Sequence, residues 1–365
     1  MFGLLGIIGF GGPAAHVALM RREVVDRRRW LGAERFADLL GITNLLPGPN
    51  STELAMHIGL DRAGRVGLLV AGIAFILPAA AIVGALAAAY VAAGSSPAGA
   101  SLLYGVKPVI IAIVAVAILQ LGRTALRGPL RLVIALAAAI LAIAGVNELL
   151  LLAGGASAMA LGRGLPGRAA WLARSALPLS LAGASAGVAA AAVSLPLLFG
   201  TFLKIGATLY GSGYVLVAFL RADFVDRLGW ITDRQLLDAV AIGQITPGPL
   251  FTTATFVGYL VAGPAGAVIA TIGIFLPAFV LVALVGRLAA RMRERPLTAA
   301  MLDGVTAAAL GLMAAVSLEL GGAAIVDPLT LGLALGGAVL LLYRVPSVWI
   351  VVAGALIGLA RGFFV

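Results

Sequence analysis

The chain carries an internal duplication, and this feature restricts its fold to two copies of one unit. Residues 10–49 and 210–249 are identical at thirteen of forty positions, and both copies end in the tripeptide Pro-Gly-Pro. Beyond the tripeptide the matches continue at an offset of 199 residues, as for Pro78 and Pro277. A register that holds over this length indicates a tandem repeat.

The duplication predicts the organisation of the whole chain. We expect a first repeat at 1–155, a linker rich in Gly, Ala and Ser at 156–198, and a second repeat at 199–365. Each repeat opens with a short apolar helix that ends at a glycine cluster, followed by an amphipathic, charged stretch. Two apolar pieces of about a dozen residues then flank Pro-Gly-Pro, and three more apolar stretches follow.

The composition assigns both repeats to a membrane. The chain is 62% hydrophobic and 11% charged, with a mean hydropathy of +1.12, and a soluble domain cannot bury that much apolar surface. The 48 glycines suit helices that approach closely, so we predict an all-α polytopic membrane protein. The net charge of +10 then reflects arginine-rich cytoplasmic loops beside anionic lipid, and no nucleic-acid partner is expected.

Cysteine is absent from the sequence, which excludes disulfides, thiol redox chemistry and thiolate metal sites. The sequence contains two histidines, His16 and His57, which are too few for a dedicated transition-metal site. We therefore expect no metal and no other cofactor.

The arginines predict that the two repeats have opposite orientations in the membrane. The loop at 122–131 carries three arginines, whereas its counterpart at 321–330 carries only Asp327. Conversely, 94–101 is uncharged, whereas 287–295 holds four arginines and one glutamate. Because cytoplasmic loops collect Lys and Arg, equivalent loops lie on opposite faces, as in an inverted-topology repeat.

The number of crossings stays open between two versions. In one, each repeat crosses three times and its last apolar stretch, interrupted near Asn147 in the first copy, is a hairpin of short helices. In the other, that stretch crosses once and residues 175–196 of the linker cross as well. A helix of about a dozen residues reaches only about 20 Å, less than the hydrocarbon core, which favours the hairpin version.

The tripeptides at 47–49 and 247–249 predict broken helices. Proline lacks an N–H and clashes with the preceding turn, and lipid tolerates such a break only where it is buried or lines a watery cavity. The half-helix that follows presents unpaired N–H groups and the positive end of its dipole, which suit an anion. Inversion makes two such ends face each other near the midplane, a geometry for a small dianion. The alternative is a tight turn between two short packed helices.

Several charged residues have two interpretations each. Arg21 and Arg221 match across the repeats and either contact an oxyanion or set the topology at an interface. Lys107 and Lys204 lie in apolar runs, and we expect both to snorkel to an interface. Glu53, early in the first half-helix, is either a cap stabilised by the helix dipole or a proton carrier that shares its proton with His57.

Three stretches together resemble one known family. They are FGGPAAH at 10–16, LLPGPNSTELAMHIG at 45–59 and AIGQITPGPLFTTATFVGY at 241–259, and they resemble the bacterial chromate ion transporter family, in its long two-domain form. The resemblance implies chromate efflux across the bacterial inner membrane, driven by the membrane potential or a proton gradient, and chromate resistance. Sulfate, which is isosteric with chromate, is the natural competing anion.

Residue chemistry and the resemblance together select the candidate site. The candidate substrate-binding residues are Pro47, Gly48, Pro49, Asn50, Ser51, Thr52, Gln244, Thr246, Pro247, Gly248, Pro249, Thr252 and Thr253. The candidate supporting residues are Gly11, Gly12, His16, Arg21, Glu53, Gly211, Gly213, Tyr214 and Arg221.

We therefore predict a secondary transporter that holds chromate between the two half-helix N-termini and moves it by alternating access. The hydroxyls of Ser51, Thr52, Thr252 and Thr253 are the expected neutral donors. The first alternative is a carrier of sulfate or a related tetrahedral oxyanion. A membrane-embedded enzyme ranks lower, because the sequence offers no convergent base and nucleophile and no metal cluster. The expected partners are the dianion and the lipid bilayer, and a homodimer is left open.

Overall fold

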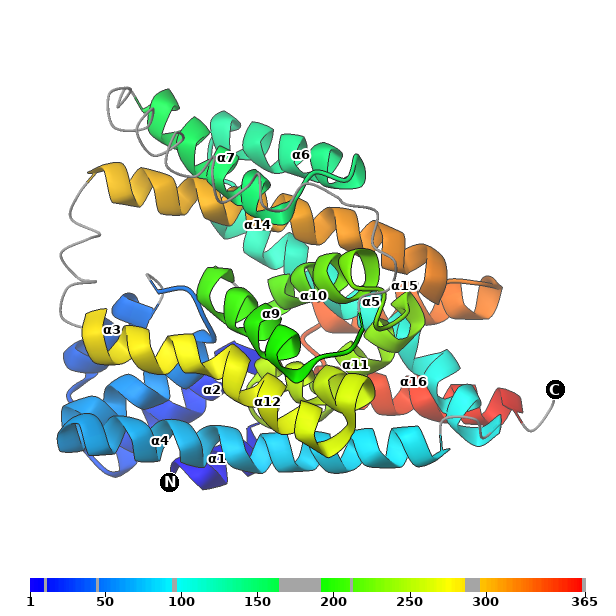
Figure 1. Ribbon diagram of the computed structural model, residues 1–365, viewed down its shortest axis with the longest axis horizontal. Coiled ribbons are helices and arrows are strands. Elements are labelled where there is room, and N and C mark those ends of the chain that lie inside the picture. Colours follow the sequence, from blue (N-terminus) through cyan, green and yellow to red (C-terminus); the bar gives the residue numbers. More distant parts are fainter. Residues whose placement is uncertain are drawn as a thin grey trace.

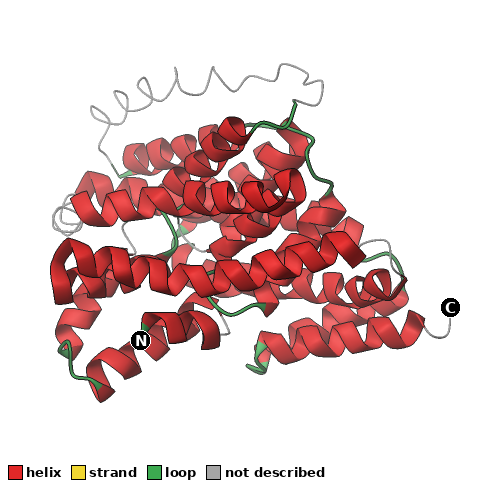
Figure 2. Cartoon of the chain, turned by 60° about the horizontal axis from the view of Figure 1, so that its bottom comes forward, coloured by secondary structure: helices red, strands yellow, loops and turns green. Residues whose placement is uncertain are grey.

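The computed structural model describes residues 1–9, 12–43, 46–93, 97–163, 192–210, 213–285 and 296–362. Every regular element in these ranges is a helix (Figures 1 and 2). Four of the described helices, α4, α5, α12 and α14, are long and apolar enough to cross a membrane. The prediction of an all-α polytopic membrane protein is confirmed. Gly11, Gly211 and most of the predicted linker lie outside the described ranges.

The first repeat contributes seven α-helices and one π-helical turn to these ranges. They are α1 (Phe2–Ile8), α2 (Gly12–Arg21), the π-helix η1 (Arg22–Arg27), α3 (Ala33–Thr43), α4 (Asn50–Ala93), α5 (Pro97–Ala125), α6 (Pro129–Ile143) and α7 (Glu148–Gly162). Proline at the first position begins α5 and α6, where a missing N–H costs nothing, and the Asn147 side chain caps α7 by accepting from the Leu149 N–H.

The second repeat follows the same order. Its elements are α9 (Leu195–Thr208), the 3₁₀ turn η2 (Gly213–Val215), α10 (Leu216–Leu220), the π-helix η3 (Arg221–Arg227), α11 (Asp233–Ile245), the 3₁₀ turn η4 (Leu250–Thr252), α12 (Thr253–Val285), α14 (Pro296–Ala324), α15 (Pro328–Leu342) and α16 (Ser347–Gly362). The predicted limits at 155 and 199 stay a prediction, and α7 and α9 run across them.

Both α4 and α12 consist of two helices joined by a sharp turn. The backbone leaves the helical region at Ala63 and Gly64 in α4, and at Ala262 and Gly263 in α12, where each glycine has a positive φ near 60°. After the turn the chain runs back along itself, since a Cβ on Gly59 would meet the backbone of Gly67. Each repeat therefore contains a short helix, here 50–62 or 253–261, followed by a long one.

Equivalent long helices run in opposite directions. In Figure 1, α4 runs from left to right and α12 from right to left, while α5 runs opposite to α14. The contacts between the repeats are exchanged symmetrically: α6 and α7 pack on α14, and α15 and α16 pack on α5. At the repeat offset, Gly105 meets the Gly354 carbonyl in one of these contacts, and Gly304 meets the Gly155 carbonyl in the other. These paired contacts describe two inverted repeats around a pseudo-twofold axis.

The last apolar stretch of the first repeat is a hairpin of two short helices, α6 and α7. They lie side by side over α14 (Figure 1), and a Cβ on Gly162, at the end of α7, would meet Leu130 at the start of α6. The corresponding stretch of the second repeat likewise forms two short helices, α15 and α16. This agrees with the hairpin version, while residues 175–191 of the linker lie outside the described part of the chain.

Candidate functional site

Each Pro-Gly-Pro lies at the tip of a re-entrant pair of short helices. In the first repeat, α3 approaches the tip and residues 50–62 run back beside it, so that Arg35 and Asp61 pair at 2.6 Å at the far end. The two helices bury Phe36 between them, together with Leu54. In the second repeat α11 and 253–261 pack together in the same way. The helix is therefore broken at each tripeptide, as predicted, and its two halves pack against each other across a tight turn, which is the arrangement that the alternative interpretation described.

The two tips are fixed by the opposite repeat. The Gly48 N–H donates to the Leu209 carbonyl at 2.8 Å, and the Gly248 N–H donates to the Gly9 carbonyl at 2.9 Å. Leu209 follows α9 and Gly9 follows α1, so each of these two hydrogen bonds is the equivalent of the other at the repeat offset of 200. Each tip thus rests on the first helix of the other repeat, and the two tripeptides are brought together at the pseudo-twofold axis.

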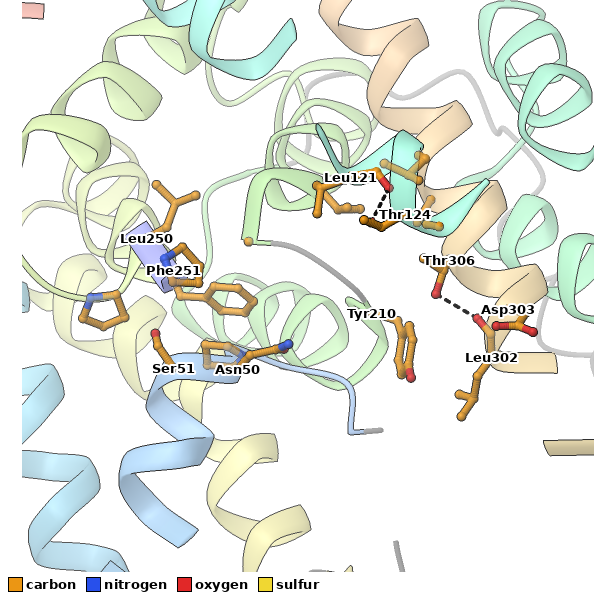
Figure 3. A pocket seen from close by; sticks show the side chains of 18 of the residues that line it. Asn50, Ser51, Leu121, Thr124, Tyr210, Leu250, Phe251, Leu302, Asp303 and Thr306 are labelled. Atoms are coloured by element: carbon orange, nitrogen blue, oxygen red, sulfur yellow. Dashed lines mark hydrogen bonds between the residues drawn. The ribbon is translucent and has the colours of Figure 1, made fainter. Parts of the chain in front are cut away.

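A cavity of about 650 Å³ lies between the two tips (Figure 3). From the first repeat it is lined by Pro49, Asn50 and Ser51, and from the second by Pro249, Leu250 and Phe251. These are equivalent positions at the repeat offset of 200, and each group consists of the last proline of its tripeptide and the first two residues of the helix that follows. The starts of both half-helices therefore border one common space.

The first repeat supplies the polar wall of this cavity. Figure 3 shows Asn50 and Ser51 at the start of α4, with the Asn50 side chain directed toward Tyr210. The N–H groups of Thr52 and Glu53 already bond the Pro49 carbonyl, at 2.8 and 3.0 Å. Asn50 and Ser51 are the polar residues of this first turn that line the cavity.

The second repeat supplies an apolar wall. Leu250 and Phe251 occupy the positions of Asn50 and Ser51. The hydroxyls of Thr252 and Thr253 turn into their own helix, donating to the Pro249 and Leu250 carbonyls at 2.8 Å each. In this conformation neither threonine lines the cavity. The hydrogen-bond donors are therefore arranged asymmetrically, whereas the sequence had suggested matching donors from both repeats.

The remaining tip residues support the loops from behind. Thr246 donates to the Ile242 carbonyl at 2.9 Å, and the Gln244 side chain is hydrogen-bonded to Tyr214. Thr52 is fully buried behind the cavity wall. Pro47, Gly48, Pro247 and Gly248 make up the rest of the tips without lining the cavity.

Glu53 is fully buried beneath the first tip. Neither of its carboxyl oxygens has a hydrogen-bond partner among the described residues, and Oε1 lies 2.5 Å from where a Cβ on Gly48 would be. The side chain therefore folds back under the tripeptide and does not bond the helix N–H groups as a cap. His57, one turn further on, is also buried, and its Nε2 has no partner among the described residues.

The glycine-cluster candidates fall into two groups. Gly213 lines the cavity, as do the neighbouring Pro13 and Tyr210. Gly12 has a φ of +74°, and His16 bonds the Gly9 carbonyl through Nε2 at 2.8 Å, so these two residues shape the junction between α1 and α2. The same Gly9 carbonyl accepts from the second tip, which links His16 to the site indirectly.

The two matched arginines lie away from the cavity. Arg21 is exposed at the end of α2. Arg221 is surrounded by carboxylates, pairing with Asp226 at 3.1 Å, with Asp233 at 2.9 Å and with Glu319. Neither lines the cavity, and the contacts of Arg221 are those of a residue that joins η3 to α11 and α14.

Both lysines form ion pairs: Lys107 is buried, which contradicts its predicted snorkelling, whereas the Lys204 side chain is 29% exposed and its snorkelling stays a prediction. Lys107 is 7% exposed and binds Asp238 at 3.0 Å. Lys204 binds Glu148 at 2.9 Å and Asp223 at 2.6 Å. Their acidic partners lie on other helices, so the sequence gave no local signal of these pairs.

Two helices that the sequence did not connect with the site complete the cavity. The end of α5 contributes Leu121 and Thr124, and the beginning of α14 contributes Asp303 and Thr306 (Figure 3). Arg131 lies at the same wall and is paired with Asp303, which also binds Arg163 at 2.6 Å. The only sequence signal for this wall is the repeat register itself, which aligns α5 with α14.

No group of three or more His, Cys, Asp or Glu residues that could hold a metal ion occurs in the part of the chain that the structure describes. Inverted repeats, re-entrant helix pairs and a cavity between their tips define a polytopic membrane protein with the architecture of a transporter. Comparison with known proteins agrees. The chromate transporter family model matches residues 1–162 and 196–359, and the chain belongs to this family.

Individual relatives cover most of the chain. A chromate transport protein of Pseudomonas aeruginosa is 36% identical over 329 residues, which are 86% of this chain and 78% of the relative. A chromate transport protein of Cupriavidus metallidurans is 36% identical over 370 residues, 97% of this chain and 90% of the relative. No solved structure matches the chain significantly. The protein is thus a multi-pass transporter of the cytoplasmic membrane and not an enzyme.

Proposed function

We propose that the chain exports chromate from the cytoplasm and binds the dianion in the cavity between its two Pro-Gly-Pro tips. The observation that carries the proposal is the common lining of this cavity by Asn50 and Ser51 from one repeat and by Leu250 and Phe251 from the other. The relatives that cover most of the chain are named as chromate transport proteins, which supports chromate as the substrate.

The polar wall suits a dianion that must bind and then leave. The start of α4 offers the Asn50 amide and the Ser51 hydroxyl together with the positive end of the helix dipole, and Arg131, which also lines the cavity, is paired with Asp303. Neutral donors bind more weakly than a bidentate arginine, so release stays fast. The apolar wall of Leu250 and Phe251 excludes water and so strengthens these few hydrogen bonds.

We assign the open side of this cavity to the cytoplasm. It lies at the end of α5 and the beginning of α14, beside the loop at 122–131 with its three arginines. Basic loops mark the cytoplasmic face, so the anion enters here and leaves after the two repeats rock against each other. At 100 mV, interior negative, two charges gain about 4.6 kcal/mol on leaving, which sustains a gradient on the order of a thousandfold without a coupled ion.

Uptake of labelled chromate into inside-out vesicles with an imposed potential tests the proposal. An inside-positive potential is expected to drive uptake, and Ser51→Ala to weaken it about tenfold or more, because a hydrogen bond to a charged group contributes about 1.5–3 kcal/mol. Thr252→Ala is the matched control, since its hydroxyl bonds a backbone carbonyl; it should reduce uptake much less.

The same vesicles separate chromate from its rivals. If sulfate inhibits chromate uptake at a concentration below that of chromate, or is transported faster than chromate, the chain would be a carrier of sulfate or a related tetrahedral oxyanion with the same site. Equal losses in Ser51→Ala and Thr252→Ala would contradict the polar-wall model and favour a symmetric site. Absence of any oxyanion flux in the unaltered protein would overturn the proposed function.

A further inference from the structure

A second cavity, of about 560 Å³, lies at the opposite ends of α5 and α14. It is the counterpart of the first cavity under the repeat offset of 199, because its lining residues on α5 correspond to lining residues on α14: Ala100 to Ala299, Tyr104 to Asp303, and Lys107 to Thr306. Leu121 and Tyr104 are seventeen residues apart on α5, so the two cavities lie about 25 Å apart along the helix.

The two cavities differ in their access to the tips. The first is lined by both tripeptide segments, whereas the lining of the second includes no residue of 46–53 or 246–253. The second cavity also lies away from the arginine-rich loop at 122–131, on the side that the charge distribution assigns to the exterior. The structure is therefore open to the site from the cytoplasmic side and closed from the other.

A buried ion pair lies where the second cavity stops. Lys107 lines this cavity about 10 Å further along α5 than Ala100, and its Nζ binds Asp238 Oδ1 at 3.0 Å. Tyr90 donates to the other oxygen of Asp238 at 2.8 Å. Asp238 is 1% exposed and belongs to α11, which leads directly into the second tip. Three helices, α4, α5 and α11, are joined at this point.

The pair has no counterpart on the open side. Asp38 occupies the equivalent position to Asp238 and is exposed, and Thr306 stands where the lysine would be, lining the open cavity. The repeats therefore differ at these equivalent positions, with a buried ion pair beside the second cavity and none at the matching place beside the first. This asymmetry makes the ion pair of Lys107 and Asp238 a candidate for the contact that opens and closes the way from the second cavity to the tips.

A bound anion can balance the positive charge of Lys107 in place of the Asp238 carboxylate. Removing one member of a buried ion pair leaves an uncompensated charge at high cost, so the exchange needs a new partner for each ion. An anion compensates Lys107. Asp238 keeps the Tyr90 hydroxyl and lies one helical turn from Arg234, which lines the second cavity. Elsewhere in the same cavity Arg361 lies over the ring of Tyr104 and is 3.4 Å from Asp327. The Tyr104 hydroxyl holds the pKa of Asp327 at about 2, so Asp327 stays charged and keeps Arg361 occupied.

Building on the proposed function, we propose that the second cavity is the exterior half of the transport path and that Lys107 binds the tetrahedral dianion there, exchanging the Asp238 carboxylate for the substrate. The loaded carrier opens to the exterior because the anion compensates Lys107. After release the pair with Asp238 forms again and closes the path. The empty exterior path thus stays closed, which prevents return of the anion.

Transport and binding measurements on the full chain test this role. Lys107→Gln is expected to reduce potential-driven chromate uptake into inside-out vesicles at least about tenfold, because the substrate loses a cationic partner in a poorly solvated site. Binding of sulfate to the purified protein, measured by calorimetry, should change less than about twofold, since Lys107 does not line the cavity that reaches the tips. Lys107→Arg keeps the charge and is expected to retain uptake.

An exchanged pair separates anion binding from mere structural pairing. The double variant Lys107→Asp with Asp238→Lys keeps one cation and one anion in contact but moves the cation to α11. The proposal predicts that uptake stays low in this variant, while gel filtration shows the same folded species as the unaltered protein. Full recovery of uptake, or unaltered uptake in Lys107→Gln, would overturn the role of Lys107 and leave the proposed function intact. Lack of oxyanion flux in the unaltered protein would instead overturn both.

Thiol labelling tests on which side of the membrane each cavity opens, and it gives a result even when the variant transports poorly. The chain contains no cysteine, so single cysteines can be introduced at Ser101 in the second cavity and at Thr124 in the first. A membrane-impermeant reagent applied to intact cells should modify Ser101→Cys and spare Thr124→Cys. The opposite pattern would show that the second cavity faces the cytoplasm and would contradict the proposal.

Discussion

Gly248 is the position at which a single methyl group is expected to disturb the site most directly. The residue has a φ of +95°, and its N–H bonds the Gly9 carbonyl of the opposite repeat. A Cβ on Gly248 would overlap the Cβ of Ala79 on α4 and come within 3.2 Å of the Gly6 carbonyl. Gly248→Ala therefore combines backbone strain with a steric conflict at the contact between the two repeats.

The two contributions can be estimated separately. A left-handed backbone costs a residue with a Cβ about 1–2 kcal/mol. Overpacking at a tight helix contact adds about 1–3 kcal/mol, so we expect a total loss of about 2–5 kcal/mol in the free energy of unfolding. Gly263 is the matched control, because its φ is +60° and no atom lies within 4 Å of its hypothetical Cβ. Gly263→Ala should show only the strain of its own backbone, about 1–3 kcal/mol, because a φ of +60° with a ψ of −152° is a conformation that residues with a Cβ rarely adopt.

Unfolding of the purified protein by SDS in mixed micelles measures this difference. The double variant Gly248→Ala with Ala79→Gly should regain the steric part, less about 1 kcal/mol for glycine within a helix. Chromate uptake should follow the same order, lowest in Gly248→Ala. Equal destabilisation of Gly248→Ala and Gly263→Ala, without recovery in the double variant, would refute the close contact between the second tip and α4.

Three further substitutions test the charges around the site. Asn50→Asp should abolish uptake, because a carboxylate at the polar wall repels a dianion about 4 Å away by about 8 kcal/mol at an effective dielectric constant of about 20; Leu250→Asn, at the equivalent position, adds a neutral polar group and serves as the control. Glu53→Gln should retain potential-driven uptake with an unaltered pH profile, since a dianion needs no proton to leave; loss of uptake would favour a proton carrier. Arg35→Ala should cost less than about 1 kcal/mol in unfolding free energy, because its pair with Asp61 is exposed, and a larger loss would mean that this pair holds the hairpin together.

Much of the fold follows from sequence patterns with a direct physical cause. The repeat register aligns Pro78 with Pro277, and the structure contains the corresponding long helices in opposite directions. The arginine distribution anticipated this inversion because anionic lipid and the insertion process act on loops, whose charges are visible in the sequence. The break at each Pro-Gly-Pro was equally visible, because it depends on the local chemistry of proline.

The arrangement within the site could not be predicted in the same way. Asn50 lines the cavity while Thr252 bonds its own backbone, although both are polar residues at the start of equivalent helices. The positions that line the cavity are the two directly after each tripeptide, Asn50 and Ser51 in one repeat and Leu250 and Phe251 in the other. Thr252 and its equivalent Thr52 come one position later and are buried. Which positions of a first turn face a cavity depends on tertiary packing.

Long-range pairs are also invisible in one sequence. Lys107 and Asp238 are 131 positions apart and belong to different repeats, and each in isolation suggests a residue reaching for the membrane surface. Their pairing depends on how α5 and α11 pack against each other, and α5 is also held against α16 by a close approach of Gly105 to Gly354. Such contacts follow from the three-dimensional packing of the repeats.

The position of the bound anion is the most direct test of the site. Crystals of the protein soaked with chromate, measured at the chromium absorption edge, would locate the metal of the oxyanion by its anomalous signal. A binding site between the tips predicts one strong peak bordered by Asn50, Ser51 and Phe251, which disappears in Ser51→Ala crystals. A peak elsewhere, for instance at Arg21 or Arg221, with none between the tips, would contradict the site proposed for this transporter.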